Sequence, residues 1–312
     1  MKNYIGSTDF ERKFLKIFRS LCGSRSSWQV WQDFVDMSAC AIANSVDKQE
    51  DVWKKREDEY MRIVKGYRKE EANDIAELLG IVVSALDENP DQDFLGKLYM
   101  QLNLGSHWHG QFFTPWHVSE LMAKIIVGDE SKKQIEKNRY ISVVDPCCGA
   151  GGMLLAFASA CREKTTDINY QQSVLFVGQD IDPVVAKMCF IQMSLIGCPG
   201  YVIIGDALIK PPKGTLLQPI YDPPENIWFT PLYFTDVWAW RRIKEQMDYM
   251  MTPTEKQSNK TETMPSKHVE KPTVIIPKTE IKEKKPFSWK EFFTVKKKEK
   301  VGCLKEMRMK DR

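Results

Sequence analysis

The sequence predicts an α/β fold in which a helical region precedes a parallel β-sheet covered by helices. Up to about residue 104 the apolar residues recur at the three- and four-residue spacing of amphipathic helices. From about residue 140, short β-branched runs alternate with helical segments. Strands that alternate with helices favour a parallel sheet with right-handed crossovers.

The individual elements follow from local signals. Helices of the first region are predicted over 28–43, 75–86 and 94–104. Strands of the second region are predicted over 140–144, 173–178 and 201–204, and its helices over 152–161, 183–196 and 238–247. Asp182 is the expected N-cap of the helix that starts at Pro183, because Asp at the cap and Pro at the first position both favour a helix start.

A further helix is predicted to begin at Thr114 and Pro115, between the two regions. Its apolar residues repeat with helical spacing, so they are predicted to form the inner face: Val118, Leu121, Met122, Ile125 and Ile126.

Composition and charge exclude several classes of protein. The net charge of the 312 residues is only +3, which is low for a strongly basic nucleic-acid binder, but residues 252–312 hold about 17 Lys and Arg against about nine Asp and Glu. Residues 252–285 have few large apolar side chains, and the tail is expected to be flexible. Eight cysteines without a CxxC pair favour neither a disulfide framework nor a metal site. No run of about 18 apolar residues occurs, so we expect a soluble, cytoplasmic protein.

A glycine-rich loop follows the first predicted strand. Its sequence is Asp145-Pro146-Cys147-Cys148-Gly149-Ala150-Gly151-Gly152. Glycines at this place remove the Cβ atoms that would keep a cofactor away from the backbone. The spacing differs from the dinucleotide fingerprint, because Leu154 stands where GxGxxG needs a glycine.

Acidic residues also follow the next two predicted strands. Asp180 ends the second strand, where a carboxylate can accept both hydroxyls of a ribose. Asp206 and Ala207 follow the third strand, where the carboxylate of Asp206 can accept a hydrogen bond from a ligand. Ligands of open α/β sheets bind at the carboxyl ends of the strands, so these acids and the glycine loop predict one ligand site.

The glycine loop resembles motif I of amino-methyltransferases, and Gly110-Gln111-Phe112-Phe113-Thr114-Pro115 resembles a motif of type I modification subunits. The chain is therefore similar to the N6-adenine DNA methyltransferases that serve as modification subunits of type I restriction–modification systems. This resemblance implies a Rossmann-like class I S-adenosylmethionine-dependent methyltransferase core. It also implies S-adenosylmethionine as cofactor, bound by Gln111, Phe112, Phe113, Thr114, Asp145, Pro146, Gly149, Gly151, Asp180, Asp206 and Ala207.

The resemblance further implies a catalytic turn of the form [Asn/Asp]-Pro-Pro-[Tyr/Phe], in which the side chain and a proline carbonyl accept the two N–H bonds of adenine N6. Asp222, Pro223 and Pro224 match three of its positions. Glu225 stands where the family has a ring that stacks on the flipped base. At most about four strands are visible before residue 252, the three given above among them, against about seven in the class, so the core is expected to be shortened.

The resemblance implies DNA as substrate and a separate specificity subunit, or another restriction–modification subunit, as partner. The expected domains are a helical one over 1–107, a methyltransferase domain over 108–251 and a basic tail over 252–312. Two alternatives stay open: a catalytically impaired, cofactor-binding relative that acts as a subunit or scaffold, and a protein or RNA methyltransferase.

Overall fold

The structure is a computed structural model that describes residues 8–23, 25–104, 113–163 and 166–251. Residues up to Glu245 form one compact unit, and a second unit runs from Gln246 to the C-terminus. Among the described residues, no helix is long and apolar enough to cross a membrane.

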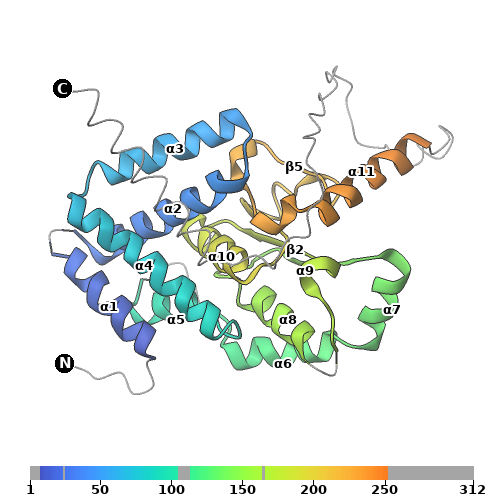
Figure 1. Ribbon diagram of the computed structural model, residues 1–312, viewed down its shortest axis with the longest axis horizontal. Helices are drawn as coiled ribbons and strands as arrows, with labels where there is room; N and C mark the ends of the chain where they lie inside the picture. The colour runs from blue at the N-terminus through green and yellow to red at the C-terminus, as the bar shows by residue number, and fades with distance from the viewer. Residues whose placement is uncertain (1–7, 24, 105–112, 164–165, 252–312) are drawn as a thin grey trace, which may run out of the picture. The chain divides into compact units, whose positions relative to one another are not determined.

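The first region is helical, as predicted. It contains α1 (Asp9–Leu21), α2 (Ser27–Val46), α3 (Glu50–Val64), α4 (Lys69–Glu88) and α5 (Phe94–Gln101), which lie together in Figure 1. Their core is aromatic: the ring of Phe14 meets those of Trp31 and Phe34 edge to face at 6.0 and 5.3 Å between centroids. Aromatic pairs at these separations add to the stability that their burial supplies.

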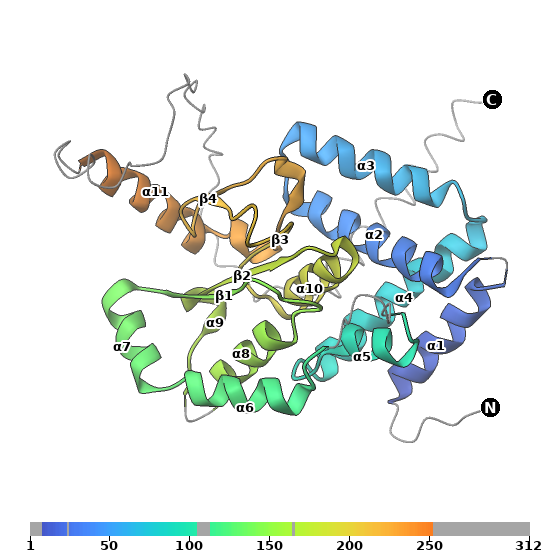
Figure 2. The ribbon, with the colours of Figure 1, turned by 180° about the vertical axis from the view of Figure 1, so that it is seen from behind.

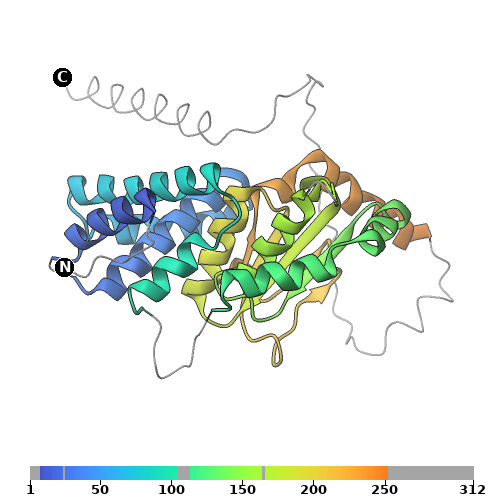
Figure 3. The same cartoon turned by 90° about the horizontal axis from the view of Figure 1, so that it is seen from below.

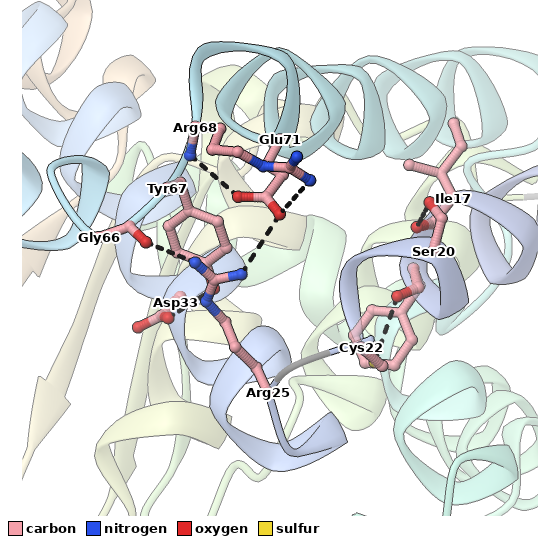
Figure 4. A network of polar contacts seen from close by, with 10 residues as sticks. Ile17, Ser20, Cys22, Arg25, Asp33, Gly66, Tyr67, Arg68 and Glu71 are labelled. Carbon is pink, nitrogen blue, oxygen red and sulfur yellow. Dashed lines mark hydrogen bonds and ion pairs between the residues drawn. The ribbon is translucent and has the colours of Figure 1, made fainter.

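A polar cluster joins α2 to the turn between α3 and α4 (Figure 4). The guanidinium of Arg25 lies 4.0 Å from the ring centroid of Tyr67, and it also donates to the carbonyl of Gly66. The Tyr67 hydroxyl donates to Asp33 at 2.6 Å, and Arg25 pairs with Glu71 at 3.6 Å. These contacts therefore link α2 and the residues just before it to the α3–α4 turn and to the first turn of α4.

The second region contains the sheet. Its strands are β1 (Ile141–Asp145), β2 (Val174–Asp180), β3 (Gly200–Ile204) and β6 (Ile227–Phe229), in the order β1-β2-β3-β6. The first three strands are parallel, and β6 runs antiparallel to β3. A separate two-stranded hairpin consists of β4 (Lys213–Gly214) and β5 (Pro219–Ile220).

Helices connect and cover the strands. They are α6 (Trp116–Ile126), α7 (Asp129–Asn138), α8 (Gly152–Arg162), α9 (Tyr170–Ser173), α10 (Pro183–Ile196) and α11 (Asp236–Met251), with 3-10 helices η1 (Pro224–Asn226) and η2 (Pro231–Phe234). Helix α10 packs on β2 and β3 and also on α2, so it joins the sheet to the helical region (Figures 2 and 3). Helix α6 packs on α8.

The predicted strands and helices of the second region are confirmed, including the parallel sheet and the cap of α10. Their bounds agree to within about two residues, except that α11 continues four residues beyond the predicted end at 247. Asp182 accepts from the N–H groups of Val184 and Val185 at 2.8 and 3.3 Å. Strand β6 was not predicted, because three residues are too few to display an alternating pattern.

The predicted inner face of α6 is wrong. The side chains assigned to it are 44–76% exposed, and the buried residues of α6 are instead Ser119 and Ala123. Small residues lie against α8 because they let the two helix backbones come close. Apolar spacing identified a helix here, but the apolar stripe faces away from the core.

Candidate functional site

The three acids predicted to line one site do end three neighbouring strands. Asp145 ends β1, Asp180 ends β2 and Asp206 follows β3 after one glycine. In the sheet register, Asp145 lies beside Gly178, and Asp180 lies beside Ile204. Because the strands are parallel, the three carboxyl groups lie along the same edge of the sheet.

The glycine loop is fixed to the end of β2 by backbone hydrogen bonds. The N–H of Cys148 donates to the Gln179 carbonyl at 2.9 Å, and the N–H of Gly149 donates to Asp180 Oδ2 at 2.8 Å. Gly151 has a φ of +92°, and a Cβ there would lie 2.7 Å from the Cys189 sulfur. Glycine is therefore needed at position 151 for its conformation and for the close packing of α10.

Asp180 keeps acceptor capacity for a ligand. Its Oδ1 accepts from the N–H of Asp182 at 3.0 Å and its Oδ2 from that of Gly149 at 2.8 Å. A carboxylate offers about four lone-pair sites, so a diol can still be accepted beside these two bonds. Burial raises the pKa of Asp180, although the bonded N–H groups lower it.

The edge as a whole is acidic. Burial also raises the pKa of Asp145, and the neighbouring charge of Asp180 adds to that effect. The N–H of Cys147 donates to Asp145 Oδ1 at 3.1 Å and partly offsets it. Two partly desolvated carboxylates side by side favour a ligand that carries positive charge near them.

The segment after β3 presents both polar and apolar groups. Asp206 Oδ1 accepts from the N–H groups of Leu208 and Ile209 at 2.8 and 3.0 Å, which fixes the turn that contains Ala207. Ile181, next to Asp180, is 68% exposed at the same edge. An exposed apolar side chain beside an acid that is predicted to bind a ribose offers a surface for a flat base.

Of the motif before α6, Phe113 and Thr114 are described, whereas Gln111 and Phe112 lie outside the described residues. The Phe113 ring lies 5.4 Å from that of Tyr99 on α5. A Cβ on Gly149 would be 3.1 Å from Phe113 Cε1, so this ring covers the glycine loop. Pro146 is exposed at the start of the loop.

Comparison with known proteins identifies the protein family of the chain. Residues 91–271 match the model of the N-6 DNA Methylase family, and this range includes the whole candidate site. The chain belongs to the N-6 DNA methylase family.

A curated relative is the type I restriction enzyme MpnII methylase subunit of Mycoplasma pneumoniae, 34% identical over 104 residues. The match covers 33% of this chain and 16% of that relative, so this chain spans a small part of the relative's length. A solved class I S-adenosylmethionine-dependent methyltransferase from Listeria monocytogenes has a TM-score of 0.35 at 13% identity, covering 65% of this chain and 55% of that one. The type I restriction-modification methyltransferase subunit from Streptococcus thermophilus has a TM-score of 0.33 at 15% identity, covering 64% and 58%.

The predicted catalytic turn of this family member lies near the end of β3. Asn226 Nδ2 donates to the Ile204 carbonyl at 3.0 Å, and a Cβ on Gly205 would lie 1.8 Å from the Tyr221 hydroxyl. Asp222, Pro223 and Pro224 are exposed between these two anchors. They share the edge with the acids but lie beside β3, whereas the glycine loop follows β1, two strands away.

Glu225, which stands where the family has a stacking ring, is held by a contact with the helical region. Glu225 forms an ion pair with Lys55 of α3 at 2.8 Å, and this pair lowers the pKa of the carboxyl. Trp228 and Tyr233 follow in sequence, but both are buried, and the Tyr233 hydroxyl donates to the Leu217 carbonyl at 2.6 Å. These rings belong to the core beneath the edge.

Sequence reasoning missed Gln179, which helps to shape the site. Its side chain is 5% exposed, and its Nε2 donates to the Gly205 carbonyl at 3.2 Å, which ties β2 to the segment before Asp206. A glutamine directly after the apolar run 174–178, and before the acid at 180, was the available signal. Among the described residues, no group of His, Cys, Asp and Glu side chains could hold a metal ion.

Proposed function

We propose that the chain is the cofactor-binding part of an adenine-specific (N6) DNA methyltransferase of a restriction–modification system, with S-adenosylmethionine as methyl donor. The observation that carries the proposal is the hydrogen bond from the Gly149 N–H to Asp180, which joins the glycine loop to the acid of the next strand. Family membership gives the class of reaction.

The residues of the edge fit this cofactor. Asp180 can accept the ribose hydroxyls, Asp206 can accept from the adenine amino group, and exposed Ile181 offers an apolar surface to the ring. The acidic end beside Asp145 suits the positive charges of the methionine part. When bound, S-adenosylmethionine supplies an electrophilic methyl group on a sulfonium. The chain itself binds and orients it, with Phe113 covering the loop.

The residues that would hold the methyl-accepting adenine match the family less well than those of the cofactor site. Asp222 and the proline carbonyls are the candidates to accept the N6 protons of adenine, which would localise the nitrogen lone pair. They lie beside β3, at the end assigned to the adenosine, whereas the methionine part is assigned to β1. With Glu225 held by Lys55 and no stacking ring, we expect methyl transfer by this chain alone to be very weak. DNA and a specificity subunit, or another restriction–modification subunit, complete the proposed assembly.

The test of cofactor binding is calorimetry on a matched pair of variants. Asp180→Asn removes the charge that accepts the ribose and should weaken S-adenosylmethionine binding by about 10- to 100-fold. Asp182→Asn removes a charge two residues away, but asparagine still caps α10, so the affinity should not change. Absence of binding by the wild type, or equal effects of the two variants, would contradict the proposed site.

The test of catalysis is transfer of labelled methyl groups to adenine in DNA, with and without a specificity subunit. Asp222→Ala should abolish whatever transfer remains if the Asp222 turn is catalytic, and Glu225→Tyr should raise it by restoring a ring. Strong transfer that survives Asp222→Ala would place the acceptor site elsewhere.

A further inference from the structure

Gln192 connects the glycine loop to the helical region. It lies on α10, its side chain is fully buried, and its amide group forms hydrogen bonds in three directions. Nε2 donates to the Ala150 carbonyl at 2.9 Å and to Asp93 Oδ1 at 2.8 Å, while Oε1 accepts from the N–H of Leu95 at 2.9 Å. Rotating the amide by 180° would oppose like groups at all three contacts, so the partners define its orientation.

The partners of Gln192 on α5 belong to the first turn of that helix. Asp93 is the N-cap and accepts from the N–H of Gly96 at 2.9 Å. Leu95 is the second helical residue, so its N–H has no partner within the helix and is satisfied by Gln192 instead. Asp93 also reaches the start of α8, because a Cβ on Gly152 would lie 3.5 Å from Asp93 Oδ2.

The partner of Gln192 in the loop is Ala150, between the two glycines of positive φ. The N–H of Gly149, just before it, donates to Asp180. The loop is therefore held on one side by the end of β2 and on the other side by Gln192. Helix α5 also reaches the loop by a second route, through the ring contact of Tyr99 with Phe113, which covers Gly149.

We propose that Gln192 is a positioning residue for cofactor binding, which sets the place of the Gly149–Gly151 turn by tying it to the first turn of α5. This inference rests on the proposed cofactor site. It makes the affinity of that site depend on the helical region, although no residue of α5 belongs to the predicted ligand set. Gln192 acts through the Ala150 carbonyl and does not itself touch the ligand.

The main variant is Gln192→Met, which keeps the length of the side chain and removes its polar atoms. It leaves the Ala150 carbonyl, the Asp93 carboxylate and the Leu95 N–H without this partner. We expect S-adenosylmethionine to bind about tenfold more weakly, as measured by calorimetry. Ser194→Ala is the matched control, because Ser194 is equally buried on the same helix and its hydroxyl has no hydrogen-bond partner. The affinity of Ser194→Ala for S-adenosylmethionine should equal that of the wild type.

A readout without cofactor separates positioning from general stability. Amide hydrogen exchange over residues 146–152 should be faster in Gln192→Met than in the wild type. Ile191→Ala opens a cavity at a fully buried position of α10, so it should lower the melting temperature and leave exchange of the loop unchanged. A structural role of Gln192 would instead make its variant behave like Ile191→Ala.

Asp93→Ala is the second variant and covers the case in which Gln192→Met does not fold. It keeps Gln192 and removes one of its two anchors on α5, so we expect about threefold weaker binding and faster exchange of the loop. Folded variants that bind within twofold of the wild type, with unchanged loop exchange, would overturn the positioning role. If the wild type does not bind S-adenosylmethionine, the proposed function fails, and the exchange experiment still decides the role of Gln192.

Discussion

The two edges of the sheet differ in how they are covered. At the β6 edge, Arg56 of α3 is 3% exposed, pairs with Asp47 at 2.8 Å and donates to the Ile227 carbonyl at 2.9 Å. Its guanidinium also lies 4.6 Å from the ring centroid of Trp228. At the β1 edge, Val144 is 51% exposed, and within the described residues β1 has a strand neighbour on one side only.

The β6 side of the sheet is therefore covered, whereas the β1 side is open in the described part of the chain. Strand β6 is the last strand on this side and runs antiparallel to β3. The helical region reaches it through α3, which packs on η1 just before β6 and donates from Arg56 to the Ile227 carbonyl. Strand β1 carries the glycine loop, and in doubly wound sheets the ligand lies beside such a strand, where the strand order reverses. The described strands therefore lie on one side of such a ligand position. The exposed apolar face of α6 lies shortly before β1 in the chain.

The largest expected effect tests the β6 edge. Arg56→Ala leaves Asp47 buried without its partner and removes the bond to Ile227, so we expect a loss of about 3–5 kcal/mol in the free energy of unfolding. Urea denaturation measures it. Lys55→Ala, one residue earlier, removes a largely exposed partner of Glu225 and should cost at most about 1 kcal/mol. Similar losses for both variants would mean that this edge is not held by the buried pair.

An intermediate effect tests the glycine loop at the other edge. Gly151→Ala places a Cβ 2.7 Å from the Cys189 sulfur at a φ of +92°, so we expect a loss of about 1–3 kcal/mol and weaker cofactor binding. The control is Gly80→Ala in the middle of α4, where a Cβ meets no atom within 4 Å, and which should be neutral or slightly stabilising. Thermal melting of both variants measures the difference in stability, and equal melting temperatures would contradict the strain expected at position 151.

The pH dependence tests the candidate ligand site, at the carboxyl ends of the strands, through its charges. Because burial raises the pKa of Asp180, acidification protonates this carboxyl at a higher pH than an ordinary aspartate, whose pKa is about 3.9. Cofactor affinity should fall as the pH falls through that raised pKa. The contribution of Asp180 to stability has the opposite sign: its charged form opposes folding, so acidification removes a cost. Calorimetry and melting across the acidic range should show these opposite trends, and Asp180→Asn should reduce both.

The smallest expected effect tests the open face of α6. Ile125 is 76% exposed, so Ile125→Gln should change the free energy of unfolding by less than about 0.5 kcal/mol. Ala123 on the same helix is 1% exposed, so Ala123→Gln should cost well over 1 kcal/mol by overpacking the contact with α8. A large loss for Ile125→Gln would show that its face is covered in the folded protein.

Much of the fold was predictable because its signals are local. The apolar period of α4, the Asp182-Pro183 start of α10 and the β-branched runs of β1 to β3 depend on neighbours in sequence. Parallel pairing then follows from the alternation of strands and helices, and it brings Asp145, Asp180 and Asp206 to one edge. Strand β6 was not predicted, because its three residues form a strand only by pairing with β3, which lies more than twenty residues earlier in the chain.

By itself, the sequence determined the alternating architecture and the acids and glycines of the candidate site, because strand ends and turn residues are encoded within a few positions of each other. Only the tertiary structure decided which face of α6 is buried, since an apolar stripe does not say what packs on it. It also decided that Asp222 lies beside β3 and that Gln192 meets Asp93 and Ala150. Those relations join residues about 20 to 100 positions apart, and they arise from the packing of whole elements, which no local pattern records.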